Sequence, residues 1–304
     1  MNRKIIHMWR NILKSHHLDE KQYLSLISHT LRHGEKRQGR NGITYSVLGQ
    51  QLRFSLRNDR IPLLTTKKMA WKTCLNELLW FVGGKTDNTI LNKKNVHIWD
   101  ANASREFLKS RDLTYTKDGD LGPIYGHQWR HFNAPYVDCD TDYQGQGVDQ
   151  LQNIIDGLTQ DKYSRRHILS AWNPCQLDQM ALPPCHIMCQ FSVNSANELS
   201  CILYQRSGDL GLGIPFNIAS YSFLLCLLAK HCALQRGELI HFIGDAHIYE
   251  EHRSMLQEQL LREIYPPPTL QINNIHTNIE DYTIKDVILN NYRYHSPISM
   301  KMIA

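Results

Sequence analysis

The sequence predicts a single domain that combines α-helices with β-strands. The chain has 304 residues, of which 42% are hydrophobic and 21% charged, so it can bury one sizeable core without a second domain. Apolar residues recur at helical spacing in some segments and alternate in others. Eight cysteines without a Cys-x-x-Cys pair indicate reduced thiols in a cytosol-like compartment, rather than disulfides or a zinc site.

Residues 1–19 read as a basic extension ahead of a domain that spans residues 20–304. An acid-free, amphipathic start is also typical of mitochondrial presequences, but this one has a single serine and no clear cleavage signal, so a cytoplasmic location is favoured. The net charge of +5 permits an anionic substrate but not an extended nucleic-acid surface. His247 and His252 lack the spacing of a metalloprotease pair, and no metal is expected.

The first predicted elements are a helix and two strands. Residues 20–33 carry five apolar side chains on one helical face. Residues 44–56 and 61–66 have the alternation of strands. Between the helix and the first strand, residues 35–44 predict a basic loop in which Arg40 is the best candidate to hold an anion.

Residues 70–83 predict a strong helix that ends at a glycine pair. Glu77 lies inside its apolar run, where desolvation would raise the carboxyl pKa toward the range of a general acid or base. The alternative is a simple ion pair with Lys72 or Lys85.

Two aromatic clusters, residues 98–100 and 122–130, are predicted in loops, where rings can stack on a flat ligand. Residues 103–120 and 131–148 are polar or rich in Asp, Gly and Tyr, which suggests insertions. Residues 148–158 have clear helical periodicity.

Arg165 and Arg166 precede a strand predicted at residues 168–172. Adjacent side chains on an extended segment point to opposite faces, so both reach one phosphate only from a flexible loop. An ion pair or a contact with a partner subunit is equally compatible with the sequence.

Cys185 follows two prolines at the start of a strand predicted at residues 185–193. It shares the face of Cys189 and Phe191, so core packing is the simplest interpretation of this thiol. A second strand at residues 199–205 makes an antiparallel hairpin plausible, and pairing would bring Arg206 close to Cys185.

Arg206 has two possible roles. A neighbouring cation favours the thiolate form of a cysteine, and a guanidinium beside the Ser207 hydroxyl also suits a phosphate. Gly208, Gly211 and Gly213 permit close approach of a ligand, but they lead into a proline and form a poor dinucleotide fingerprint.

Asn217 precedes a buried helix predicted at residues 218–234, which we judge too short and interrupted to span a membrane. Its amide is either a helix cap or a reader of a base edge. A last helix is predicted from about Asp245, its candidate N-cap, to the prolines at 266–268, and a last strand at residues 270–275. The apolar C-terminal residues are expected to dock on the domain.

Several motifs, in order, resemble the folate-dependent thymidylate synthases from about residue 22 to residue 304. They are Glu77-Leu-Leu-Trp-Phe, Ile98-Trp-Asp, Gly119-Asp-Leu-Gly-Pro-Ile-Tyr-Gly, Arg165-Arg166, Leu182-Pro-Pro-Cys-His, Tyr204-Gln-Arg-Ser-Gly-Asp, Pro215-Phe-Asn-Ile-Ala-Ser-Tyr and Gly244-Asp-Ala-His-Ile-Tyr.

The resemblance implies an α/β fold of the α+β type, with a large mixed sheet flanked by helices and two subunits packed sheet to sheet. It implies methylation of dUMP to dTMP, with 5,10-methylenetetrahydrofolate supplying the carbon and a hydride and leaving as dihydrofolate. Cys185 would attack C6 of the uracil, while Glu77 and Tyr125 would manage the protons at O4 and C5.

The resemblance also implies the site residues. Catalytic roles would fall to Cys185, Glu77, Tyr125, His186, Asp209 and Asn217. The nucleotide would be bound by Arg40, Cys185, His186, Gln205, Arg206, Ser207, Gly208, Asp209, Asn217, His247 and Tyr249, and by Arg165 and Arg166 of the other subunit. The folate would be bound by Lys67, Ile98, Trp99, Asn102, Asp209, Leu212, Gly213, Phe216, Tyr249, Met302 and Ile303.

Two alternatives remain open. The related deoxycytidylate hydroxymethylases have Asp at the position of Asn217, so the amide favours uracil, although an amide can rotate. A nucleic-acid-binding regulator would need a contiguous basic face, which the mixed charges do not favour. The chain also departs from the family pattern after Arg40, where the loop is one residue shorter, and at Ile303.

Overall fold

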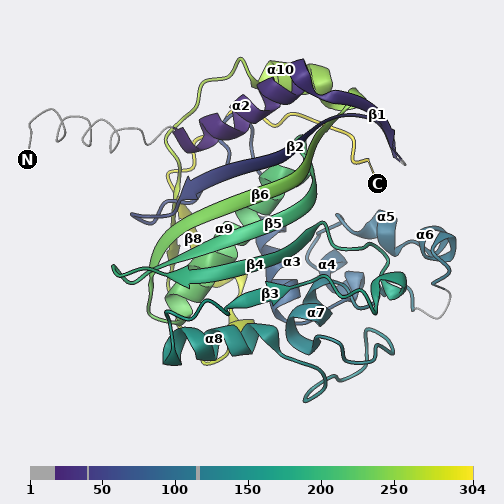
Figure 1. The fold of residues 1–304 in the computed structure, drawn as a ribbon, viewed down its shortest axis with the longest axis vertical. Helices are drawn as coiled ribbons and strands as arrows, with labels where there is room; N and C mark the ends of the chain where they lie inside the picture. Colours follow the sequence, from purple (N-terminus) through teal and green to yellow (C-terminus); the bar gives the residue numbers. More distant parts are fainter. Residues whose placement is uncertain (1–17, 40, 114–116, 304) are drawn as a thin grey trace, which may run out of the picture.

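The structure, a computed structural model, describes residues 18–39, 41–113 and 117–303. Its centre is a six-stranded sheet with the order β1-β2-β6-β5-β4-β3 (Figure 1). The β5–β6 pair is parallel and the other pairs are antiparallel, which confirms the predicted mixed sheet. The strands are β1 (Glu35–Gly39), β2 (Gly42–Ser55), β3 (Ile168–Ser170), β4 (His186–Val193), β5 (Glu198–Asp209) and β6 (Gln235–Tyr249), and a separate two-stranded sheet contains β7 (Thr269–Ile272) and β8 (Val287–Asn290).

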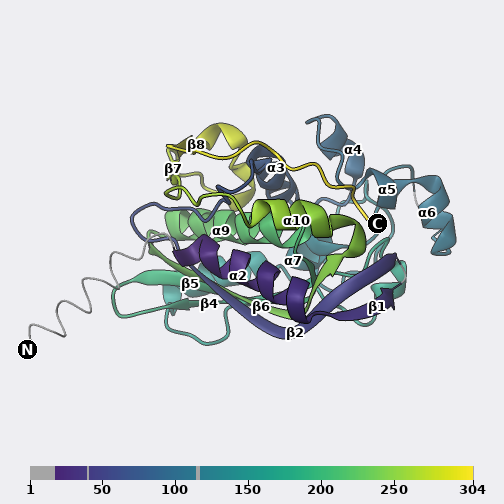
Figure 2. The ribbon, with the colours of Figure 1, turned by 90° about the horizontal axis from the view of Figure 1, so that it is seen from above.

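The helices α2, α9 and α10 lie on the same side of the sheet, and the described residues leave its other face open (Figure 2). The α-helices are α2 (Leu18–His33), α3 (Trp71–Val82), α4 (Asn88–Asn92), α5 (Asp100–Ala103), α6 (Arg105–Ser110), α7 (Tyr125–His131), α8 (Gln150–Gln160), α9 (Gly213–His231) and α10 (Arg253–Gln259). Short 3-10 helices are η1 (Leu177–Gln179), η2 (Glu250–His252), η3 (Ile279–Asp281) and η4 (Ile284–Asp286).

Helix α9 forms the centre of the core and connects β5 to β6. Fourteen of its residues are buried. In the described part of the chain it is also the helix whose length and hydropathy would suffice to cross a membrane, but 78% of the apolar window is buried within the fold. The predicted buried helix is thus confirmed, although it is longer than expected and includes Asn217 within its first turns rather than before them.

The most periodic segments match their predictions closely. Helices α2, α3 and α8 form where the apolar spacing indicated. Helix α3 ends at Val82 and is followed by the predicted glycine pair, of which Gly84 is in the left-handed region. The β4–β5 pair is the predicted antiparallel hairpin. The C-terminal tail docks, since Met300 packs on the core.

Two predictions near the N-terminus are wrong. Residues 35–39 form the edge strand β1 rather than a loop, because their polar pattern suits a strand exposed on most sides. Residues 61–66 are buried but form no strand. The backbone N–H groups of Thr65 and Thr66 donate to the Glu20 carboxylate, at 2.9–3.0 Å, and are not available to a ladder.

The helix predicted from Asp245 is also wrong, because this segment is the end of β6. Gly237, Leu239, His241 and Ile243 are buried in alternation, as in a strand with one buried face. A histidine inside that buried series hid the alternation. The helix that follows, α10, ends at Gln259, well before the prolines.

Other loops contain more regular structure than expected. The 122–130 cluster includes the buried helix α7, and the polar stretch 103–120 includes α6. The last predicted strand forms as β7, which pairs with β8, a strand not predicted. Most of the predicted basic extension, and with it the choice between an extension and a presequence, lies outside the described residues.

Candidate active site

Cys185 lies immediately before β4, and its backbone N–H donates to the Tyr125 hydroxyl at 2.8 Å. A register irregularity between His186 and Met188 interrupts the alternation of the strand. Consequently Cys189 is buried while Cys185 is partly exposed, so the expectation that they share one face is wrong. The thiol is held at the end of the strand rather than inside the core.

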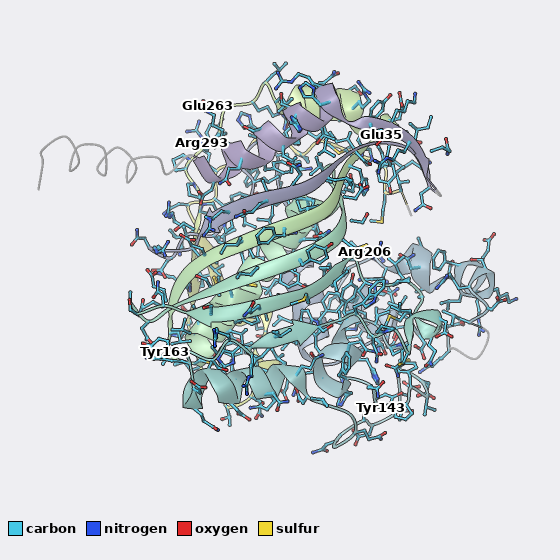
Figure 3. The ribbon with its side chains drawn as sticks, in the orientation of Figure 1. Glu35, Tyr143, Tyr163, Arg206, Glu263 and Arg293 are labelled. Atoms are coloured by element: carbon cyan, nitrogen blue, oxygen red, sulfur yellow. The ribbon has the colours of Figure 1, made fainter. Side chains whose placement is uncertain are left out.

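Arg206 is the cation beside this thiol. Its Nη2 lies 3.7 Å from Cys185 Sγ, and its backbone N–H donates to the Cys185 carbonyl at 2.9 Å. Nε and Nη2 also donate to the carbonyls of Pro184 and Pro183, so the two prolines fix the guanidinium as well as the thiol. Nη1 makes no hydrogen bond within the described residues. Figure 3 shows Arg206 at the end of the sheet where β4 and β5 meet.

Glu77 is the predicted acid of α3, and it is half-buried. It accepts a hydrogen bond from Trp99 Nε1 at 2.8 Å, and it forms no ion pair with a lysine in the described part of the chain. Desolvation raises the pKa of Glu77 to about 7, although the Trp99 hydrogen bond opposes the shift. The prediction of an acid poised near neutrality is confirmed, and the ion-pair alternative is wrong. Trp99 in turn packs against the ring of Tyr125, whose hydroxyl contacts Cys185.

His186 is buried between aromatic side chains. Its ring stacks on Tyr125 at 4.1 Å, and its Nδ1 lies 2.8 Å from the Tyr221 hydroxyl. Burial lowers the pKa of His186 to about 3, so the ring is neutral at physiological pH. Tyr221 was not among the predicted residues, although a tyrosine in a buried helix needs a partner for its hydroxyl.

The ends of β5 and β6 bring the next residues together. Because the two strands are parallel and in register, Ser207 lies opposite Asp245 and Asp209 opposite His247. His247 Nδ1 lies 3.2 Å from Asp245 Oδ1, and its ring contacts Tyr249. Residues from two distant motifs thus form one continuous edge.

Asp209 closes this edge. Its carboxylate accepts the N–H groups of Gly211 and Leu212 at 2.8 and 3.0 Å, and His252 Nδ1 lies 3.7 Å away. Burial alone would raise the pKa of Asp209, but the His252 imidazole and the Gly211 N–H outweigh it, so the pKa is lowered. The buried Lys67 donates to the Gly211 carbonyl at 2.5 Å, and burial lowers its pKa to about 8.

Gln205 links the strand to the helix. Its Nε2 donates to Asn217 Oδ1 at 3.0 Å and to the Ser207 carbonyl at 2.9 Å. Its Oε1 lies 2.9 Å from Nε2 of His241, a buried residue that sequence reasoning did not select. His252 was considered only as a metal ligand, but its Nε2 lies 2.8 Å from the Lys301 carbonyl of the tail.

Some predicted residues lie elsewhere. Arg165 and Arg166 are exposed, and Gln190 Nε2 donates to the Arg165 carbonyl, which fixes these residues near the far end of β4. Figure 3 shows Tyr163 at the opposite end of the sheet from Arg206. Gln190 is five positions along the chain from Cys185, which corresponds to about 16 Å of extended strand. In one chain the two arginines therefore lie far from the thiol.

The remaining predicted residues have varied surroundings. Arg40 lies outside the described residues. Asn102 and Gly208 are buried, Ile98, Gly213, Phe216 and Ile303 are half-buried, and Met302 is 51% exposed. The described residues include one group with metal-ligand atoms within 4.8 Å of one another, Asp87, Cys139 and Asp140, outside this site.

Comparison with known proteins agrees with this arrangement. The chain matches the thymidylate synthase family over residues 21–304. It is 52% identical over 285 residues to the thymidylate synthase of Ascaris suum, covering 93% of this chain and 97% of the relative. It is 50% identical over 284 residues to that of Equine herpesvirus 2, covering 93% and 98%.

Longer relatives also match. The chain is 50% identical over 285 residues to a putative bifunctional dihydrofolate reductase-thymidylate synthase of Oryza sativa subsp. japonica, covering 93% of this chain and 57% of the relative. It spans about half the length of such bifunctional relatives. The match along nearly the whole chain shows that the protein belongs to the thymidylate synthase family.

Proposed function

We propose that this protein methylates dUMP to dTMP, with 5,10-methylenetetrahydrofolate as the source of the carbon and the hydride and dihydrofolate as the second product. The observation that carries the proposal is the Cys185 thiol 3.7 Å from Arg206 Nη2, next to Tyr125. Covalent activation of a pyrimidine needs a nucleophile, a cation that favours its ionised form, and a group that carries protons near neutral pH. Cys185, Arg206 and Glu77 fit these three roles.

The thiolate attacks C6 of the uracil. Arg206 favours the ionised thiol, and the N–H groups of its Nη1, which have no partner in the described residues, are available to the substrate phosphate. The Ser207 hydroxyl follows directly in sequence and supplies a further phosphate donor. His247 and Tyr249, on the adjoining strand, bind the ribose hydroxyl.

Attack at C6 places negative charge on C5 and O4, and Glu77 manages the protons there through water. Its pKa of about 7 lets it both donate and accept a proton near neutral pH. Tyr125 lies between this acid and Cys185, since its ring contacts Trp99 and its hydroxyl accepts from the Cys185 N–H.

The residues at the end of β5 suit a folate. A pterin ring presents N–H donors on a flat apolar body, and the Asp209 carboxylate is an acceptor held in place by two backbone N–H groups. Phe216 and Trp99 supply flat apolar surface. The buried Lys67 adds positive charge to this region while it holds the Gly211 carbonyl. When bound, the folate supplies the one-carbon unit and the hydride.

The open face of the sheet supports a homodimer. Tyr204 and Phe242 are neighbours in the parallel ladder and are 44% and 40% exposed, and Ile168 on β3 is 41% exposed. Apolar patches of this kind mark association surfaces. A partner packed on this face would bring its own Arg165 and Arg166, which cannot reach the thiol of their own chain, toward the phosphate.

Tyr204→Asp should dissociate this dimer. A carboxylate in a desolvated interface costs several kcal/mol, so the substitution should convert a species of twice the 35.4 kDa chain mass into the monomer. Sedimentation equilibrium measures the change. Val137→Asp, at a more exposed apolar residue in a loop (60% against 44% for Tyr204), is the control, and equal dissociation by both would refute the assignment of this face.

Two inactive variants should restore activity to each other. In a mixture of refolded Cys185→Ala and Arg165→Ala/Arg166→Ala chains, half of the dimers contain one complete site, so about a quarter of the wild-type activity should return. As a control, Cys185→Ala chains are mixed with chains that carry all three substitutions, which cannot form a complete site. If both mixtures stay inactive, the arginines do not act across the interface.

The reaction itself is tested by tritium release from [5-³H]dUMP in the presence of methylenetetrahydrofolate, together with the rise in dihydrofolate absorbance. Equal amounts of both products would support the proposal. Tritium release without dihydrofolate would point to hydroxymethylation, and no release from the folded dimer would overturn the proposal.

A further inference from the structure

Three polar side chains on three elements, two of them buried and the third half-buried, form a chain of hydrogen bonds. His241 of β6 is 0% exposed and Gln205 of β5 is 2% exposed. His241 Nε2 lies 2.9 Å from Gln205 Oε1, and Gln205 Nε2 lies 3.0 Å from Asn217 Oδ1 on α9. Buried groups of this kind are retained only when each donor meets an acceptor.

The direction of each hydrogen bond follows from chemistry. Gln205 Oε1 can only accept, so His241 must carry its proton on Nε2. Burial lowers the pKa of His241 to about 3, and the neutral ring has a single N–H. Its Nδ1 has no hydrogen-bond partner among the described residues, which agrees with this tautomer.

This fixed proton sets the orientation of both amides. If Gln205 turned over, its Nε2 would face the His241 N–H and its Oε1 would face two acceptors, Asn217 Oδ1 and the Ser207 carbonyl. If Asn217 turned over, its amino group would face the amino group of Gln205. Each reversal places donor against donor at the buried Gln205 amide, which then loses a hydrogen bond that water cannot replace.

A fixed amide distinguishes uracil from cytosine. Uracil presents the N3–H donor beside the O4 acceptor, whereas cytosine presents an acceptor at N3 beside an amino donor. A freely rotating amide would serve both bases by turning over. We propose that His241 is a positioning residue which, through Gln205, locks the Asn217 amide in the orientation that accepts uracil and rejects cytosine; this inference rests on the proposed function.

The test compares dissociation constants for dUMP and dCMP, measured by calorimetry, in wild type and His241→Phe. Phenylalanine fills the space but has no N–H, so only the Ser207 carbonyl still opposes a joint reversal of Gln205 and Asn217, and we expect the ratio of the two constants to fall roughly tenfold. His127→Phe is the matched control, because His127 is also buried and neutral but its ring contacts Tyr136 and Tyr143 instead of Gln205. Its ratio should stay at the wild-type value.

An unchanged ratio in His241→Phe, with both nucleotides weakened equally, would overturn the inference and leave His241 as a packing residue. Should the variant not fold, neutron diffraction of the wild type decides the matter. Hydrogen on Nε2 of His241, with the amide orientations above, supports the lock, and hydrogen on Nδ1 alone refutes it. Failure of the proposed function is recognised separately, because wild type would then form no dTMP.

Discussion

Cys185→Ala should abolish dTMP formation, with kcat falling by roughly 10⁴ or more, because no other group in the site can form the bond to C6. Binding of dUMP should persist, since Arg206 and the other polar contacts remain. The free energy of unfolding should change by less than about 1 kcal/mol, because the side chain is partly exposed. Tritium release measures the loss of turnover, and thermal unfolding measures the change in stability.

Cys175→Ala is the matched control for this variant. Cys175 is a free thiol like Cys185, but it is exposed and has no contact with Arg206. It should keep wild-type activity. Residual tritium release in Cys185→Ala within tenfold of wild type would show that the nucleophile is another residue.

Glu77→Gln should lower kcat by about 10²- to 10⁴-fold while KM for dUMP changes little, because the amide can neither donate nor accept a proton in turnover. Gln keeps an oxygen for the Trp99 Nε1 hydrogen bond, so the local packing is preserved. Steady-state kinetics from pH 5 to 9 measures the effect. In the wild type, activity should depend on a group that titrates near pH 7, and this dependence should disappear in the variant.

The same carboxyl should affect stability with a defined sign. Its pKa of about 7 in the folded state lies above the ordinary value of 4.5, so folding favours the protonated form. Stability is therefore complete below about pH 4.5 and is lost as pH rises through 7, by at most about 3 kcal/mol because the side chain is partly exposed. Glu77→Gln should be stabilising at pH 8 and nearly neutral at about pH 4 in urea unfolding. A difference that does not vary with pH would contradict this account.

The sequence was most informative where the determinants are local. The apolar spacing of α8 and the acid inside α3 are visible in a short window, so the helices and the unusual environment of Glu77 could be predicted. The β4–β5 hairpin likewise follows from two neighbouring strands, and with it the approach of Arg206 to Cys185.

The features that sequence reasoning missed depend on distant parts of the chain. Strand β6 was not recognised because His241 interrupts its buried face, and that histidine is buried only because Gln205 satisfies its N–H. The partial exposure of Cys185 depends on an irregular pairing with β5, which no periodicity reveals. The position of Arg165 and Arg166 relative to the thiol requires the register of β3 on β4.

The pairing of β2 with β6 has a consequence for how the chain folds. Thr44 pairs with Tyr249, so the two strands that join the N-terminal half of the sheet to the rest are about 200 residues apart in sequence. During synthesis β2 emerges early and must wait, with an unpaired edge, until β6 leaves the ribosome. Because His247 and Tyr249 occupy the end of that late strand, the proposed nucleotide site cannot form in a nascent chain that ends before β6.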